Sequence, residues 1–320
     1  MYLQRVLMTA AVAATGLFLT ACATGPESRD VTNSYQCGQL DVHVTSLGNG
    51  DHLEVDYKGE RLQLERKVSA SGARYEAPDD EKTQFWSKGE WAMFSVKGQA
   101  YPDCLQAGAL ETPFEATGNE PFWDMRLMHQ QMELNRLDDT GEPKKVTLET
   151  TVSNQNGREF RGKLDGQPLS LKVDRQLCED TMSGAQFPAQ VRLELNGEVL
   201  EGCGGDPERL FRGVEWVVED LAGAGIIDSS RMTVEFFDEN RLAGRASCNR
   251  YGGQYELTAE GMTFDYMFST KMACAPALMN QEGRFLELMS NVKRAEIGPN
   301  GKLVLTTSAN EEITAYKATY

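Results

Sequence analysis

The sequence predicts a mainly β protein of three small antiparallel β-rich domains, the last of which carries one packed helix. Apolar and polar residues alternate over most of the chain, which is the pattern of strands that bury one face. Turn signals such as Asn196-Gly197 and Asn300-Gly301 interrupt the alternating runs and indicate hairpins. One run, residues 278–292, follows the three-to-four spacing of a helix instead.

The expected elements follow in chain order. In the first unit, strands are expected over 40–44, 53–57 and 62–64, the last two joined at Lys58-Gly59. In the middle unit, strands are expected over 146–152, 169–173 and 191–195. In the third unit, the alternating runs 232–236 and 303–305 flank the helix, which has Pro276 near its start.

Composition and charge limit the class of protein. The chain has 320 residues, of which 40% are hydrophobic and 8% aromatic, so it is neither a disordered acidic tail nor a multi-spanning membrane protein. Its 48 acidic and 32 basic side chains give a net charge of -16. That charge argues against nucleic acid as a partner and suits a basic one.

The first residues resemble the signal peptide of a bacterial lipoprotein. A basic start, Met1–Arg5, precedes the uncharged apolar run Val6–Leu19 and the segment Leu19-Thr20-Ala21-Cys22, which resembles the lipobox. The resemblance implies cleavage after residue 21 and acylation of Cys22, which would anchor the chain in a membrane.

The residues after Cys22 extend this expectation. By resemblance to sorted lipoproteins, Ala23 in place of an aspartate favours the outer membrane, with the protein facing the periplasm. Residues 22–34 would then be the lipidated cysteine and a polar tether.

Six further cysteines are expected to form disulfides, because the periplasm oxidises thiols. Six cysteines allow 15 pairings, and the sequential one is the simplest if each pair belongs to its own domain. The six are Cys37, Cys104, Cys178, Cys203, Cys248 and Cys274. No Cys-x-x-Cys motif is present and the three histidines are scattered, so neither a metal site nor a cofactor is expected.

The candidate joints between domains are residues 105–113 and 204–212. They predict domains over 35–108, 113–205 and 212–320, after a signal peptide over 1–21 and a tether over 22–34. Units of this size have small cores, which a disulfide would help to stabilise.

Enzyme motifs are missing from the sequence. It has no Gly-x-Ser-x-Gly elbow, no phosphate-binding loop and no His-Glu-x-x-His segment. The chain is therefore not expected to be an enzyme. A hydrolase that uses carboxylates such as Glu120 and Asp180 is the remaining enzyme hypothesis.

The first unit carries two linked motifs. They are Ser69-Ala70-Ser71-Gly72-Ala73-Arg74-Tyr75 and Phe85-Trp86-Ser87-Lys88-Gly89, between Cys37 and Cys104. From the residues alone, they form a long hairpin with a core Trp-Phe pair and an incidental lysine. In this order, however, they resemble the MliC-type family of periplasmic or membrane-bound inhibitors of chicken-type lysozyme. The resemblance covers about residues 35–104 and implies a small β-barrel.

The family resemblance also implies roles for individual residues. Ser71 and Lys88 would reach the two catalytic carboxylates of the lysozyme, and Gly72 would let the loop enter the cleft. Tyr75 would support the loop, and Ser69 is a second candidate for the serine role. A lysine beside a catalytic carboxyl group favours its ionised form, whereas glycoside hydrolysis needs one protonated carboxyl group.

The middle unit resembles an uncharacterised domain of envelope lipoproteins. The resemblance lies in Gly118-Asn119-Glu120-Pro121-Phe122-Trp123 and in Cys178-Glu179-Asp180-Thr181-Met182-Ser183-Gly184. Glu120, Asp180 and Ser183 are candidates to line a site. The favoured interpretation is that Glu120 and Asp180 accept hydrogen bonds from backbone amides around a disulfide.

The third unit resembles the META domain, the HslJ-like group. The resemblance lies in Ser247-Cys248-Asn249-Arg250-Tyr251-Gly252, in Ser269–Cys274 and in a helix with Glu282. The departures are Ser247 for glycine and Tyr251 for phenylalanine. The family is associated with envelope stress, heat shock and antibiotic resistance. Asn249 and Arg250 are interpreted as a polar turn held by a disulfide rather than as a ligand site.

Together these features predict an envelope lipoprotein that inhibits chicken-type lysozyme by occluding its catalytic cleft. The alternative is an envelope stress-response or antibiotic-tolerance scaffold that lacks lysozyme inhibition.

Overall fold

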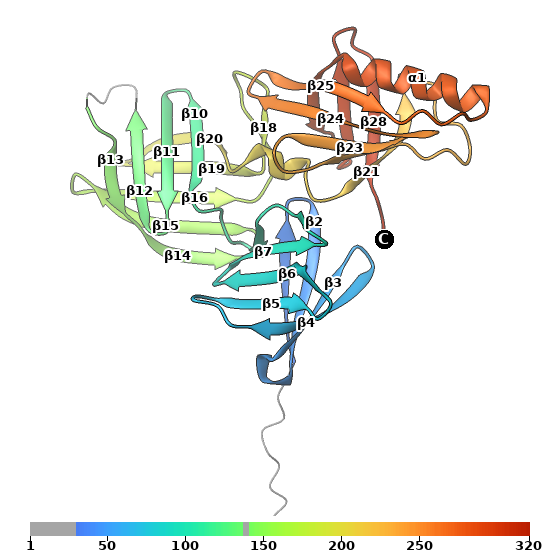
Figure 1. Cartoon of the computed structure of the whole chain (residues 1–320). Helices are drawn as coiled ribbons and strands as arrows, with labels where there is room; N and C mark the ends of the chain where they lie inside the picture. Colours follow the sequence, from blue (N-terminus) through green and yellow to red (C-terminus); the bar gives the residue numbers. More distant parts are fainter. Residues whose placement is uncertain (1–29, 137–140) are drawn as a thin grey trace, which may run out of the picture.

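The computed structural model describes residues 30–136 and 141–320 (Figure 1). The expected signal peptide and the expected lipid-bearing Cys22 lie outside these residues. Within them, the chain forms three antiparallel sheets, one short separate hairpin and one α-helix, which confirms the mainly β fold. No helix of this part is long and apolar enough to cross a membrane.

The first sheet closes on itself. Its strands are β1 (Val31–Cys37), β2 (Leu40–Leu47), β3 (His52–Tyr57), β4 (Glu60–Lys67), β5 (Ala73–Ala77), β6 (Asp80–Lys88), β7 (Trp91–Val96), β8 (Gln99–Ala100) and β9 (Cys104–Gln106). The order is β6-β5-β4-β3-β2-β1-β9-β7-β8, and a further pairing of β6 with β7 closes the ring. Val42, Val55, Phe85 and Phe94 are buried in it, so the ring is a small barrel filled by side chains.

The connections of this barrel divide between its two ends, because consecutive strands run in opposite directions. The connections β2–β3, β4–β5 and β6–β7 lie at one end, called here the motif end. The connections β1–β2, β3–β4, β5–β6 and β7–β8 lie at the opposite end, called here the capped end.

The second sheet has a core of its own. Its strands are β10 (Phe114–Asn119), β11 (Phe122–Met128), β12 (Gln131–Arg136), β13 (Lys144–Thr147), β14 (Glu149–Asn154), β15 (Gly157–Leu164), β16 (Gln167–Asp174), β19 (Ala189–Leu195) and β20 (Glu198–Gly204). They are ordered β13-β12-β11-β10-β20-β19-β16-β15-β14, and β17 (Cys178–Glu179) with β18 (Gln186–Phe187) forms the separate hairpin. Trp123, Leu134, Leu171 and Leu193 belong to this core.

The third sheet carries the helix. After the 3₁₀ turn η2 (Pro207–Leu210) come β21 (Glu215–Leu221), β22 (Thr233–Phe236), β23 (Arg241–Ala246), β24 (Asn249–Thr258), β25 (Gly261–Ser269), α1 (Pro276–Ser290), β26 (Val292–Ile297), β27 (Leu303–Thr307) and β28 (Glu312–Lys317). The strand order is β25-β24-β23-β22-β21-β28-β27-β26. Phe285 and Met289 of α1 are fully buried, as their spacing predicts. Val292, expected at the end of the helix, instead begins β26.

Three disulfides join Cys37 to Cys104, Cys178 to Cys203 and Cys248 to Cys274. This is the sequential pairing, with one bridge associated with each large sheet.

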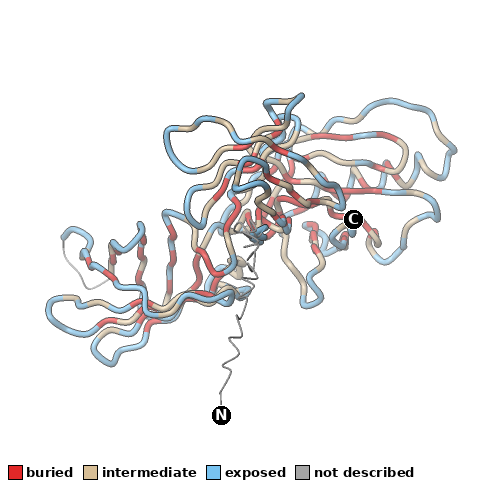
Figure 2. The backbone as a smooth tube through the Cα atoms, turned by 90° about the horizontal axis from the view of Figure 1, so that it is seen from below, coloured by how far each residue is buried: buried red, intermediate tan, exposed pale blue. Residues whose placement is uncertain are grey.

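The first and third sheets are packed together although the second separates them in sequence. Their buried apolar residues form one continuous cluster, whereas those of the second sheet form another. In Figure 2 the buried segments run along the strands, and the exposed segments lie mainly at turns and outer edges. The barrel is therefore one part of a larger packed unit.

Candidate functional site

The two motifs of the first unit lie side by side at the motif end. The first motif supplies the β4–β5 loop, and the second supplies the end of β6. Strands β5 and β6 pair with Ala73 opposite Ser87 and Arg74 opposite Trp86. This register sets Ser71 and Gly72 next to Ser87 and Lys88, because each residue beyond a paired position continues the same ladder.

Gly72 lets the loop approach β6 closely. Its backbone has φ +68°, and a Cβ atom at this position would lie 2.3 Å from the carbonyl oxygen of Ser87. A left-handed conformation is accessible to glycine without strain. The close approach of the two motifs therefore requires glycine at position 72.

Side-chain hydrogen bonds hold the loop in shape. The Ser69 hydroxyl lies 3.1 Å from the carbonyl oxygens of both Ser71 and Gly72 and donates to them. The Trp86 indole N–H donates to the Ser71 carbonyl at 2.9 Å. Ser69 is thus engaged within the loop, whereas Ser71 is exposed and its hydroxyl has no hydrogen-bond partner within residues 30–136 and 141–320.

Tyr75 supports the motif end from inside. Its side chain is only 5% exposed, and its hydroxyl donates to the carbonyl of Gly50 in the β2–β3 connection at 3.1 Å. Tyr75 therefore joins β5 to the β2–β3 connection and is not part of the exposed surface.

Lys88 lies at a tight hairpin between β6 and β7. It pairs with Trp91 across the turn, and Gly89 has φ +63° at the first central position, as in a type II′ turn. The lysine side chain is exposed and forms no ion pair within the part of the chain that the structure describes. Across the same two strands, the rings of Trp86 and Trp91 lie edge to face with centroids 6.4 Å apart.

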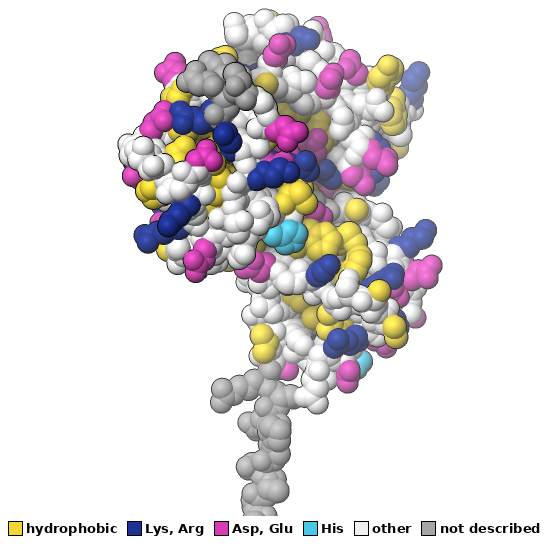
Figure 3. Space-filling view, turned by 90° about the vertical axis from the view of Figure 1, so that its left-hand side faces the viewer, with side chains coloured by type: hydrophobic (Ala, Val, Ile, Leu, Met, Phe, Trp, Pro, Cys, Tyr) yellow, Lys and Arg dark blue, Asp and Glu magenta, His cyan; other side chains and the backbone are white. Residues whose placement is uncertain are grey.

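The β4–β5 loop also carries an exposed apolar side chain. Val68, which begins the β4–β5 loop, is 99% exposed. In the view of Figure 3, hydrophobic side chains lie among basic ones on the lower part of the molecular surface. The exposed groups at the motif end thus combine a hydroxyl, an ammonium and apolar surface.

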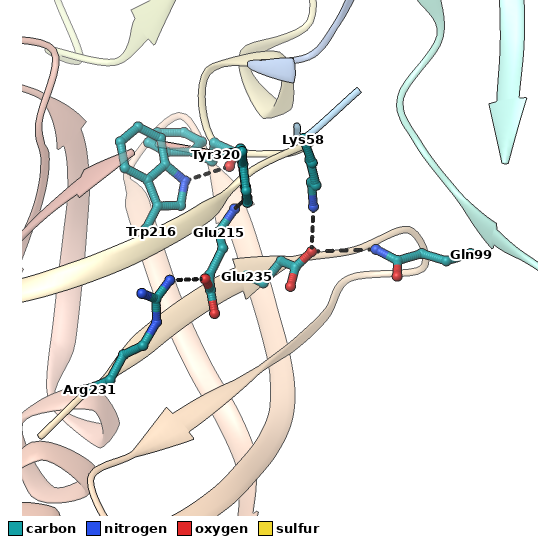
Figure 4. Close-up of polar contacts among 8 residues, drawn as sticks. Lys58, Gln99, Glu215, Trp216, Arg231, Glu235 and Tyr320 are labelled. Atoms are coloured by element: carbon teal, nitrogen blue, oxygen red, sulfur yellow. Dashed lines mark hydrogen bonds and ion pairs between the residues drawn. The ribbon is translucent and has the colours of Figure 1, made fainter. Parts of the chain in front are cut away.

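The third sheet covers the opposite end of the barrel (Figure 4). Lys58, in the β3–β4 connection, lies 3.4 Å from the carboxylate of Glu235, which also accepts a hydrogen bond from Gln99 at 3.4 Å. The Lys58 ammonium lies over the rings of Tyr101 and Tyr320, 5.2 and 5.6 Å from their centroids. Burial alone would lower the pKa of Lys58, but Glu235 and the two tyrosines outweigh it and the pKa is raised.

Backbone contacts complete this cover. The backbone N–H of Gln39 donates to the carbonyl of Arg212 at 2.8 Å. The buried guanidinium of Arg209 donates to the carbonyls of Asp103 at 2.7 Å and Gln36 at 3.1 Å, beside the Cys37–Cys104 disulfide. Because all these contacts lie at the capped end, the third sheet leaves the motif end uncovered.

In the second sheet, Asp180 serves the backbone. Its carboxylate accepts hydrogen bonds from the N–H groups of Met182 at 3.2 Å and Ser183 at 2.8 Å, and from the Ser183 hydroxyl at 2.7 Å. Burial by itself would raise the pKa of Asp180. These hydrogen bonds and one from Asn119 together have the larger effect, so the pKa lies below its ordinary value. The interpretation as a backbone acceptor is confirmed for Asp180. It is wrong for Glu120, which is exposed; Asn119 reaches Asp180 instead, at 2.7 Å.

In the third sheet, Asn249 belongs to a buried polar cluster with Glu282 of α1. The Glu282 carboxylate accepts from the N–H groups of Cys248 at 3.2 Å and Asn249 at 2.7 Å, and from the Asn249 amide at 2.9 Å. The Asn249 carbonyl oxygen accepts from Thr270 and Met272, both at 2.7 Å. The polar turn is confirmed for Asn249, and Arg250 is exposed beside it. The motif includes Glu282, but nothing in its residue spacing predicts this hydrogen bond between the helix and the turn.

No group of histidine, cysteine, aspartate or glutamate within residues 30–136 and 141–320 could hold a metal ion.

Comparisons with known proteins identify two of the three units. The family model described as membrane-bound lysozyme-inhibitor of c-type lysozyme, MliC, matches residues 35–102. The META domain model matches residues 209–320. No curated protein matches the chain. An NMR structure of a protein from Burkholderia xenovorans matches 35% of this chain and 86% of its own at 21% identity. Its TM-score of 0.30 is too low to indicate a shared fold. Two separate family models thus match this chain, MliC over the barrel and META over the third sheet.

Proposed function

We propose that this protein inhibits chicken-type lysozyme by inserting the Ser71 loop and the Lys88 hairpin into the catalytic cleft. The observation that carries the proposal is that Ser71 and Lys88 are exposed neighbours at the end of the barrel that the third sheet does not cover. Neither side chain has an ion-pair or hydrogen-bond partner within the described residues. Both are therefore available to a partner's carboxylates.

The chemistry of these two groups suits a glycosidase cleft. An enzyme of this type uses one protonated and one ionised carboxyl group on either side of the scissile bond. The Lys88 ammonium would favour the ionised form of a nearby acid, and the Ser71 hydroxyl can donate to the other. The inserted loop would also exclude the substrate, so inhibition requires no chemical step by this protein.

The loop is preorganised for insertion. Hydrogen bonds from Ser69 and Trp86 hold its backbone. Because Gly72 has no side chain, the loop can lie close against β6. A loop that is already in its bound shape loses less conformational entropy when it binds. Val68 would add apolar contact at the entrance to the cleft.

Charge would speed the encounter. The chain carries a net charge of -16, and lysozymes of this class are strongly basic. Opposite net charges raise the association rate more than they tighten the final complex. The rate of association should therefore fall as salt is added.

The proposal extends to location. Acylation at Cys22 would anchor the protein, and Ala23 favours the outer membrane, with the three domains facing the periplasm. An inhibitor in this place would meet lysozyme before the enzyme reached the cell wall. Metabolic labelling with a tagged fatty acid, with Cys22→Ser as the unlabelled control, tests the anchor.

Inhibition is tested with the full chain carrying Ser71→Ala and Lys88→Ala together. We expect the inhibition constant to rise at least about thirtyfold, because losing charged hydrogen bonds in a buried contact costs about 2 kcal/mol or more. Lys82→Ala, an exposed lysine on β6 near the capped end, is the matched control and should inhibit like the wild type. Equal inhibition by the double variant and the wild type would overturn these roles.

A second candidate is the envelope stress-response or antibiotic-tolerance scaffold, which the META match favours. In that case the wild-type chain would leave lysozyme fully active, and deletion of the protein would change survival under envelope stress instead.

A further inference from the structure

We propose that Arg158 of the second sheet is a positioning residue for Lys88: it binds Glu90 and so prevents Glu90 from pairing with Lys88. The inference rests on the proposed inhibitory role of Lys88, and it gives the middle domain a part in that role.

The contact that carries the proposal joins two domains. Arg158 is the second residue of β15, and its Nη2 atom lies 2.5 Å from Oε2 of Glu90. The arginine side chain is 17% exposed, whereas that of Glu90 is 52% exposed. The more buried partner thus comes from the second sheet and reaches the motif end of the barrel.

Glu90 belongs to the same tight turn as Lys88. Gly89 and Glu90 are the two central residues between the paired Lys88 and Trp91. The carbonyl of Glu90 accepts a hydrogen bond from the backbone N–H of Gln106 at 2.9 Å, which holds its backbone. The Glu90 side chain can therefore turn either toward Arg158 or toward Lys88, two residues before it.

Close packing keeps Arg158 near the barrel. A Cβ atom on Gly108, which follows β9, would lie 1.7 Å from the carbonyl oxygen of Asn154 at the end of β14. The β14–β15 turn therefore lies directly against the segment that leaves the barrel. Arg175 of the second sheet also donates a hydrogen bond to Gln36 of β1. These contacts fix the distance between Arg158 and the hairpin.

The ion pair with Arg158 changes which cation the Glu90 carboxylate attracts. Without the arginine, the nearest cation on its own turn is Lys88, and opposite charges this close attract each other. That pair would have to break before Lys88 could bind a carboxylate of a partner. Arg158 removes the competition by occupying Glu90.

The test uses the full chain with Arg158→Gln, with Glu90→Gln, and with both substitutions. We expect Arg158→Gln to raise the inhibition constant for chicken-type lysozyme roughly two- to fivefold, the range of one competing surface ion pair. Adding Glu90→Gln should restore the inhibition constant to the wild-type value, because no acid then competes for Lys88. Arg126→Gln, an exposed arginine of the second sheet paired with Glu115, is the matched control and should change nothing.

A spectroscopic measurement separates this inference from the inhibitory role itself. The ¹⁵Nζ resonance of Lys88 should shift in Arg158→Gln and return in the double variant, whether or not the protein inhibits lysozyme. If the ¹⁵Nζ resonance of Lys88 does not shift in Arg158→Gln, the inference is wrong, and the proposed function is unaffected. A loss of inhibition that Glu90→Gln fails to restore would likewise show that Arg158 acts only through folding. Absence of inhibition by the wild type, with the expected shifts of Lys88, would overturn the proposed function alone.

Discussion

The indole N–H of Trp86 donates a hydrogen bond to the carbonyl of Ser71 at 2.9 Å, so the second motif holds the loop of the first. This contact joins residues fifteen positions apart in the sequence and makes the two motifs one rigid surface.

Removing the indole donor should loosen the loop. Trp86→Phe keeps the ring but loses the bond to Ser71, so inhibition of lysozyme should weaken roughly three- to tenfold, equivalent to a net hydrogen bond of about 0.5–1.5 kcal/mol. Titration against chicken-type lysozyme measures this. Trp91→Phe is the control, since the Trp91 indole donates no hydrogen bond within the residues that the structure describes. Equal weakening by both would assign the effect to the aromatic surface instead.

Adding a methyl group at position 72 should destabilise the barrel. In Gly72→Ala the new Cβ meets the Ser87 carbonyl in addition to the left-handed backbone, so the free energy of unfolding should fall by about 2–4 kcal/mol. Gly89→Ala has a similar φ of +63° but open space around the new methyl group, so it should lose only about 1 kcal/mol. Urea denaturation of both variants measures the difference. Equal losses would mean that the loop moves away from β6 without penalty.

The buried carboxylate of the META domain should be a stability determinant. Glu282→Gln replaces a charged acceptor of three N–H groups with an amide and should lower the free energy of unfolding by about 1–3 kcal/mol. Glu287→Gln, exposed on the same helix, should change it by less than about 0.5 kcal/mol. Thermal unfolding followed by circular dichroism compares the two. A stable Glu282→Gln variant would mean that the cluster is not essential to the fold.

Asp180 should make the stability depend on pH in the acid range. Its pKa in the folded protein lies below the ordinary value of 3.8, so the folded state favours the ionised form. The stabilisation is complete above the unfolded pKa and is lost as the pH falls through the lower folded pKa. Asp180→Asn should therefore unfold with a shallower dependence of Tm on pH between about 2 and 4. A wild-type slope in Asp79→Asn with a shallower slope in Asp180→Asn would be the supporting result; equal slopes in the two variants would refute it.

The sequence was most informative where structure depends on neighbouring residues. Alternating residues such as Val191, Leu193 and Leu195 identified a strand because each one-residue step reverses the face. The three-to-four spacing placed Phe285 and Met289 on the buried side of α1. The motifs around Ser71 and Lys88 identified the lysozyme-inhibitor unit, since their residue types and order are specific.

The tertiary structure decided what depends on contacts between distant residues. The pairing of β6 with β7 and of β1 with β9 closes the barrel, and closure determines which connections share an end. Local periodicity contains no information on that closure. The sequence favoured Ser71 over Ser69 because Ser71 directly precedes Gly72, but only the structure shows that the Ser69 hydroxyl bonds within the loop while Ser71 is exposed.

What the sequence determined by itself is therefore the class of fold, the positions of several strands and of the helix, and the resemblance of two units to known families, all of which local patterns encode. Only the tertiary structure decided that the META domain covers the end of the barrel opposite Ser71 and Lys88, and that Arg158 of the middle domain reaches Glu90. The physical reason is that packing between domains depends on surface shape and charge at sites such as Lys58 and Glu235, 177 residues apart. No periodicity along the chain records such a contact.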